Sequence, residues 1–181
     1  YGVSRQEQDE FALRSQRRAA SPEAKAAFAE EITPVEVKGR KPYTVEADEH
    51  PRPDTTLEAL ARLKPVFEEN GTVTAGNASG INDGAAALVL TRESVAAERG
   101  LRALVSLEAV VTAAMEPELM GYAPVLALRK LFERTGTGPK DIDVFEVNEA
   151  FAAQAVAVIR DAGLDPEKTN PYGGAIALGH P

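Results

Sequence analysis

Apolar residues recur at helical spacing over several parts of the chain, and most of these parts carry a start or stop signal. Ser4 and Glu7 have the spacing of a capping box, which predicts a helix from there to about residue 20. Ser21 followed by Pro22 predicts the start of a second helix. The other predicted helices, which share this apolar spacing, run from Thr56 to before Pro65 and over residues 92–99, 124–134 and 149–162.

Shorter apolar or alternating runs lie between these helices and predict strands. They cover residues 32–37, 85–90, 103–112 and 142–147, and Pro34 restricts the first of them to the edge of a sheet. Strands that alternate with helices predict an α/β fold with covered sheets. Residues 1–70 are more charged and richer in proline, with a surface excursion over residues 38–55, as expected of an inserted domain.

Composition narrows the class of protein. The 181 residues have 44% hydrophobic and 27% charged content, which is typical of a soluble protein, and we expect a cytoplasmic one without membrane insertion. A net charge of −8 argues against a nucleic-acid partner. The absence of cysteine and the presence of only two histidines argue against a metal site.

Asn148 is the first candidate for chemistry, because it lies where a predicted buried strand ends and a predicted helix begins. In α/β folds the carboxyl ends of strands border the usual ligand crevice. An asparagine amide there is able to orient a water or to donate to an oxyanion. Asparagine is also a good helix N-cap, and its spacing alone favours that structural interpretation.

Three other features are also candidates, each with a plainer alternative. His180 lies in a glycine-rich turn, where an imidazole is able to act as a base or donor, although a single loop histidine usually has no role. The small residues of 71–84 leave backbone groups open to an extended ligand, or else form a tight connection. Met120 lines an apolar pocket, or more commonly fills a core.

Three segments together resemble the thiolase family, the acyl-CoA acetyltransferases. Residues 71–87 (GTVTAGNASGINDGAAA) resemble the substrate-loop signature of the family. Residues 148–152 (NEAFA) and 173–181 (GGAIALGHP) resemble two of its catalytic motifs, and all three occur in the family's order. The likeness extends over essentially the whole chain.

The resemblance implies a Claisen condensation between acyl-CoA and acetyl-CoA, or its thiolytic reverse. His180 is then expected to activate a nucleophilic cysteine and to donate to the thioester oxygen, and Asn148 to fix a water that completes the oxyanion hole. Coenzyme A is implied as a substrate, with no permanently bound cofactor. The residues implied in CoA or acyl binding are Arg52, Ala75, Ala78, Ser79, Met120 and Phe151.

The family fold implies a five-layered α-β-α-β-α sandwich, of which this chain holds a part. Residues 1–80 are expected to be the later part of a loop domain, 81–103 the end of the N-terminal half, and 104–181 the first part of the C-terminal half. The two catalytic cysteines of the family fall before residue 1 and after residue 181, so we expect a central fragment of a longer protein. A homodimer or homotetramer is implied for the intact protein.

Two other functions compete with this interpretation. The first is a non-catalytic module that binds CoA or an acyl group, which is consistent with the absence of cysteine. It predicts CoA binding that Arg52→Ala weakens and that thiol reagents leave unchanged. A ketoacyl synthase is less consistent with the sequence, because those enzymes pair two histidines near the nucleophile. Here His50 lies in the charged, proline-rich excursion, and the single His180 follows the Asn-Glu-Ala-Phe motif.

Overall fold

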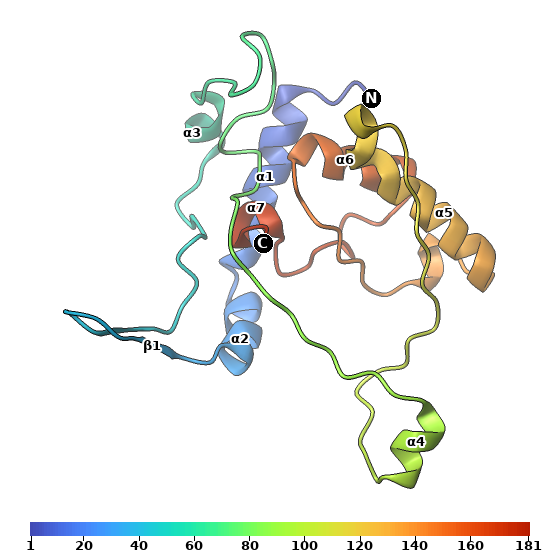
Figure 1. Cartoon of the computed structure of the whole chain (residues 1–181). Coiled ribbons are helices and arrows are strands. Elements are labelled where there is room, and N and C mark those ends of the chain that lie inside the picture. Colours follow the sequence, from blue (N-terminus) through green and yellow to red (C-terminus); the bar gives the residue numbers. More distant parts are fainter.

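The computed structural model describes residues 1–181 and is built mainly from helices (Figure 1). The helices are α1 (Arg5–Ala19), α2 (Pro22–Glu31), α3 (Leu57–Ala61), α4 (Glu93–Glu98), α5 (Ala123–Thr135), α6 (Ala152–Asp161) and α7 (Ala175–Leu178). Two 3-10 turns, η1 (Pro117–Tyr122) and η2 (Pro139–Asp141), and two strands, β1 (Val35–Val37) and β2 (Tyr43–Val45), complete the elements.

The helix ends confirm the signals predicted from the sequence. The hydroxyl of Ser4 accepts from the backbone N–H of Glu7 at 3.2 Å, and the Glu7 carboxylate accepts from the Ser4 N–H at 2.7 Å. Ser21 caps α2 with Pro22 in its first turn. Gly136 ends α5 with a φ of 69°, a left-handed conformation that glycine adopts without cost.

The hydrophobic core lies where α1 packs against α6 and α7. Phe11 and Ala12 of α1 meet Ala155 and Ile159 of α6, and Ile176 of α7 closes the cluster. Small residues on α6 allow the two helices to approach closely. In Figure 1, α1 lies between α6 and the segments that lead to α3, so both ends of the sequence reach the same core.

The strands are fewer than the sequence predicts. β1 and β2 form one antiparallel hairpin with Val35 opposite Val45, and it projects away from the rest of the chain in Figure 1. The strand predicted at residues 32–37 therefore begins only after Pro34. The excursion predicted at residues 38–55 contains its partner.

Three predicted strands, at residues 85–90, 103–112 and 142–147, are wrong for the chain as it stands. The first two are extended but make no strand pairing, and their large apolar side chains, such as Val89 and Leu104, are exposed. A strand needs a neighbour that satisfies its backbone groups, and none lies beside these segments. Phe145 makes a single bridge to Thr169 and is buried, as the apolar pattern of 142–147 predicts.

The helix predicted at residues 149–162 begins later, at Ala152, and its predicted apolar stripe is largely confirmed. Ala155 and Val158 are fully buried, and Ala162 is half-buried. None of the helices combines the length and the hydropathy that a bilayer span requires. The domain boundaries at residues 80 and 103 stay predictions.

Candidate functional site

Asn148 and His180, the two residues predicted to be catalytic, lie together although 32 positions separate them in the sequence. The side-chain nitrogen of Asn148 is 3.3 Å from Nδ1 and 3.2 Å from Nε2 of His180. An amide N–H donates to whichever ring nitrogen carries no proton. Asn148 is exposed and His180 is half-buried, so the pair has one side open to a ligand.

The position of Asn148 is fixed by the residue before it rather than by a helix. The backbone N–H of Val147 donates to the side chain of Asn170 at 2.7 Å, and the Asn170 amide donates back to the Val147 carbonyl at 2.7 Å. The N-cap of α6 is Phe151. The interpretation of Asn148 as a helix cap is therefore wrong, because the chain stays non-helical for three residues after it.

His180 is held by the glycine-rich loop that the sequence singles out. Its backbone N–H donates to the Gly80 carbonyl at 3.0 Å, and its own carbonyl accepts from the Asn82 N–H at 3.2 Å. Gly179 has a φ of 99°, and a Cβ there would meet the Asn82 side chain at 2.5 Å. Glycine is thus required for the turn that presents the imidazole.

The same loop reaches the segment that follows Asn148. Ser79 donates to the Ala150 carbonyl from its backbone N–H and from its hydroxyl, both at 3.0 Å. Ala78 pairs with Phe151 in an isolated antiparallel bridge. The structure therefore brings Ala78, Ser79 and Phe151 beside the Asn148–His180 pair.

The other predicted substrate residues lie on neighbouring segments. Met120 is 70% exposed on η1, and the next residue, Gly121, lies against Gln154 of α6. Arg52 is exposed, and its backbone N–H donates to the Gln16 side chain at 2.7 Å. Ala75 is exposed in the turn before Ala78. The roles of these residues in CoA or acyl binding stay predictions.

Glu149 is a residue of the site that sequence reasoning missed. It is 2% exposed, and its carboxylate accepts from the Ser15 hydroxyl at 2.6 Å, the Asn170 amide at 2.8 Å and the Ile176 N–H at 3.3 Å. No signal in the local sequence marks this burial, because the donors that a buried carboxylate needs come from distant segments. The cluster ties Asn148 to both α1 and α7.

The charge of Glu149 also acts on a nearby carboxyl group. Burial raises the pKa of Glu146, and the negative charge of Glu149 raises it further. No group of three or more metal-ligating side chains is placed to hold a metal ion. The site holds an amide and an imidazole beside the buried Glu149 carboxylate.

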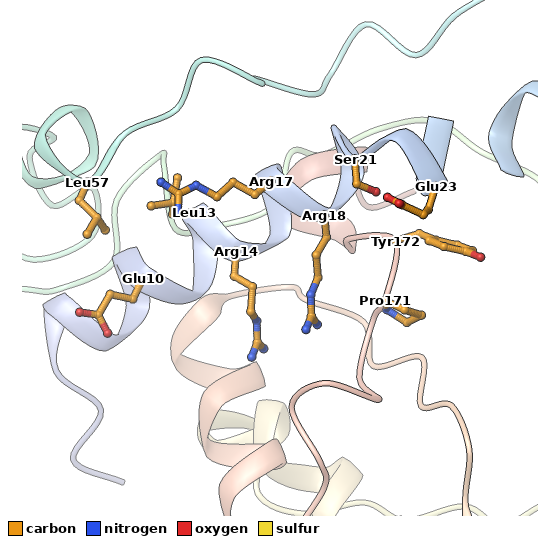
Figure 2. Close-up of a pocket in the computed structure, with 10 residues that line it drawn as sticks. All are labelled: Glu10, Leu13, Arg14, Arg17, Arg18, Ser21, Glu23, Leu57, Pro171 and Tyr172. Carbon is orange, nitrogen blue, oxygen red and sulfur yellow. The ribbon is translucent and has the colours of Figure 1, made fainter. Parts of the chain in front are cut away.

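A cavity of about 690 Å³ lies elsewhere, along α1 (Figure 2). Figure 2 shows Arg14 and Arg18 leaving the same side of α1, with Tyr172 at the far end. The guanidinium of Arg18 is already bound, because it donates to the carbonyls of Pro166 and Thr169 and to the Glu167 carboxylate. Burial lowers the pKa of Arg14, and the charge of Arg18 lowers it further. None of the predicted substrate residues lines this cavity.

Comparison with known families gives two matches that together cover almost the whole chain. Residues 1–94 match the model described as "Thiolase, N-terminal domain". Residues 101–181 match the model described as "Thiolase, C-terminal domain".

Individual relatives carry thiolase names. The chain is 55% identical over 184 residues to a beta-ketoadipyl-CoA thiolase of Pseudomonas knackmussii, covering all of this chain and 46% of the relative. It is 54% identical over 183 residues to the 3-oxoadipyl-CoA/3-oxo-5,6-dehydrosuberyl-CoA thiolase of Escherichia coli K12, covering 99% of this chain and 46% of the relative. It is 51% identical over 180 residues to an acetyl-CoA acetyltransferase of Paracoccus denitrificans, covering 99% of this chain and 46% of the relative. The chain thus spans about half the length of the curated relatives it matches.

Solved structures give the same result for the fold. The acetyl-CoA acetyltransferase of Bacillus anthracis superimposes with a TM-score of 0.94 at 46% identity, over 99% of this chain and 46% of that one. Human mitochondrial 3-ketoacyl-CoA thiolase superimposes with a TM-score of 0.92 at 45% identity, over the same shares of the two chains. The structure is therefore part of an α/β fold of the kind these two proteins have, as the sequence predicts.

Proposed function

Because this chain belongs to the thiolase family, we propose that the protein containing it transfers acyl groups between acyl-CoA and acetyl-CoA. The reaction is a Claisen condensation or its thiolytic reverse on a 3-oxoacyl-CoA. One observation carries the proposal: the side-chain nitrogen of Asn148 lies within 3.3 Å of His180, beside the loop of Ser79. We propose this activity for the whole protein, of which this chain is a part.

His180 and Asn148 act on the thioester oxygen in this proposal. A ring N–H of His180 donates to the oxygen as negative charge develops on it, and a water held by the Asn148 amide supplies the second donor. Donors that are fixed before the reaction stabilise an oxyanion better than mobile solvent does. The hydrogen bonds from His180 to Gly80 and from Asn82 to His180 supply that fixation.

The nucleophile comes from outside residues 1–181, since these contain no cysteine. In thiolysis its thiolate attacks the 3-oxo carbon, and the bond between that carbon and the α-carbon breaks. The electron pair passes to the α-carbon and its thioester oxygen, where the donors hold it until a proton arrives at the α-carbon. Acetyl-CoA leaves, and CoA then takes the acyl group from the cysteine.

CoA itself is proposed to lie along the loop at residues 75–79. Ala75 and Ala78 present small side chains there, and Ser79 keeps its hydroxyl next to the backbone that leads to Phe151. Arg52 adds an exposed guanidinium suited to a phosphate of the nucleotide. Several relatives are named for beta-ketoadipyl-CoA, so a 3-oxoacyl-CoA with a terminal carboxylate is the first substrate to test.

The experiment is a thiolysis assay on the protein that contains this chain, with the Asn148→Ala variant. Loss of one oxyanion-hole component predicts a kcat about 10²–10³-fold lower than that of the wild type. Asn70→Ala is the matched control, because Asn70 is exposed and makes no side-chain hydrogen bond, and its kcat should equal the wild-type value. CoA binding without any turnover by the wild-type protein would instead support a non-catalytic binding module.

A further inference from the structure

The second histidine, His50, lies against both segments that hold His180. Its Nδ1 is 2.9 Å from the carbonyl oxygen of Ala177, in α7. Its Nε2 packs against Gly80 so closely that a Cβ at that glycine would collide with the ring. Gly80 is the residue whose carbonyl accepts from the backbone of His180. The half-buried ring of His50 thus fills the space between the end of α7 and the loop.

The segment of His50 is fastened to α7 at a second point. The Gln16 side chain accepts from the Arg52 N–H at 2.7 Å and donates to the Ile176 carbonyl at 3.3 Å. Gln16 is buried, so this bridge is shielded from solvent. Residues 50–52 are therefore tied to α7 through two successive carbonyls, those of Ile176 and Ala177.

We propose that His50 is a positioning residue, which aligns the turn of His180 with the segment that carries Arg52. This inference rests on the proposed acyl transfer, and His50 itself touches neither substrate nor reacting atoms. A carbonyl oxygen only accepts, so Nδ1 of His50 must carry a proton. The Nδ1–H of His50 then donates to the Ala177 carbonyl, and the Nε2 side of the ring packs against Gly80.

The first experiment tests this contact in the protein that contains this chain. Nitrogen-15 NMR of the histidine rings assigns to His50 the signals that the His50→Phe variant lacks. At about pH 9, where an ordinary imidazole is neutral, His50 should carry its proton on Nδ1. A proton on Nε2 instead would overturn the inference.

The second experiment measures thiolysis in the protein that contains this chain. His50→Phe keeps a ring but removes the donor, and we expect kcat about three- to tenfold lower, with a raised KM for CoA. His50→Asn keeps an N–H near the position of Nδ1 and should restore most of both values. Glu49→Gln is the control, because Glu49 is exposed and makes no hydrogen bond, and it should match the wild type.

Rates are expressed per folded protein, so that a merely structural role is recognised. If His50→Phe lowers only the yield or the melting temperature and leaves kcat and KM unchanged, the inference is wrong. The same holds if His50→Asn is as impaired as His50→Phe. An active wild type with an indifferent His50→Phe variant overturns this inference alone, whereas an inactive wild type overturns the proposed function together with it.

Discussion

Glu149 is the residue that joins the two sides of the site. Its buried carboxylate accepts from Ser15 of α1, from Asn170 and from the N–H of Ile176 in α7. Asn148 precedes it directly, so the place of the Asn148 amide depends on this cluster. A carboxylate with three protein donors also makes the cluster sensitive to loss of any one partner.

We predict that Glu149→Ala lowers the free energy of unfolding by about 3 kcal/mol, because three donors lose their acceptor in a buried place. Urea unfolding followed by circular dichroism measures this change. Glu133→Ala is the control, since Glu133 is exposed and makes no side-chain hydrogen bond, and its effect should stay within about 0.5 kcal/mol. Equal effects of the two substitutions would show that the Glu149 cluster contributes little.

At the level of residues, the sequence predicts chemistry where a motif repeats a known pattern. The proximity of Asn148 and His180 follows from the motifs and not from periodicity, which favoured a helix cap for Asn148. Glu149 and His50 were missed for a physical reason. Glu149 accepts from Ser15 and Asn170, and His50 bonds the Ala177 carbonyl and packs against Gly80. Such long-range contacts leave no trace in local spacing.

The contact between α1 and the turn before α7 depends on one glycine. Gly173 has a φ of 81°, and a Cβ there would lie 2.6 Å from the Ser15 carbonyl oxygen. Both the left-handed backbone and the close approach exclude a side chain. This turn also positions the backbone N–H of Gly174 to donate to the Ser15 hydroxyl at 3.0 Å.

Gly173→Ala should therefore lower the free energy of unfolding by about 1–3 kcal/mol, through backbone strain and a displaced α1. The midpoint of urea unfolding is the measurement. Gly39→Ala provides the comparison, because no heavy atom lies within 4 Å of a Cβ at that position, and its midpoint should stay near that of the wild type. A stable Gly173→Ala variant would mean that the turn adjusts freely.

Helices were predicted better than strands, and the difference is physical. Helix ends are set by local groups, such as Ser4 with Glu7 or Gly136, and these are visible in the sequence. Strands depend on partners. Residues 103–112 alternate as a strand should, yet their backbone pairs with no other strand in this chain.

For the whole molecule, two extended segments join the core to α4, as Figure 1 shows. They comprise residues 85–92 and 102–116, and their N–H groups make no hydrogen bond. Side chains of α5 donate to two carbonyls of the second segment, from Lys130 to Thr112 and from Arg134 to Val110. Such segments open at almost no cost in free energy.

Amide hydrogen exchange of the 181-residue chain should therefore be unprotected over 85–92 and 102–116. Residues 155–161 of α6, whose N–H groups are bonded within a packed helix, should exchange much more slowly. Mass spectrometry of peptic fragments separates these regions. Protection over 103–112 equal to that of α6 would show that this segment is paired as a strand.

The fold class was predicted from the alternation of elements and from the resemblance, and the similarity to two solved thiolases confirms it. The layers were not derivable from this chain by periodicity alone, because only one hairpin pairs within it. The proposed domain boundaries remain predictions for the same reason.

The central claim is that His180 belongs to the acyl-transfer machinery of a thiolase, and one measurement tests it most directly. It is the kcat for thiolysis of a 3-oxoacyl-CoA by the protein that contains this chain, compared between wild type and His180→Ala. Loss of a positioned proton donor predicts a kcat about 10²–10⁴-fold lower in the variant, with the fold retained. An active wild type with an unchanged kcat in His180→Ala would contradict the account.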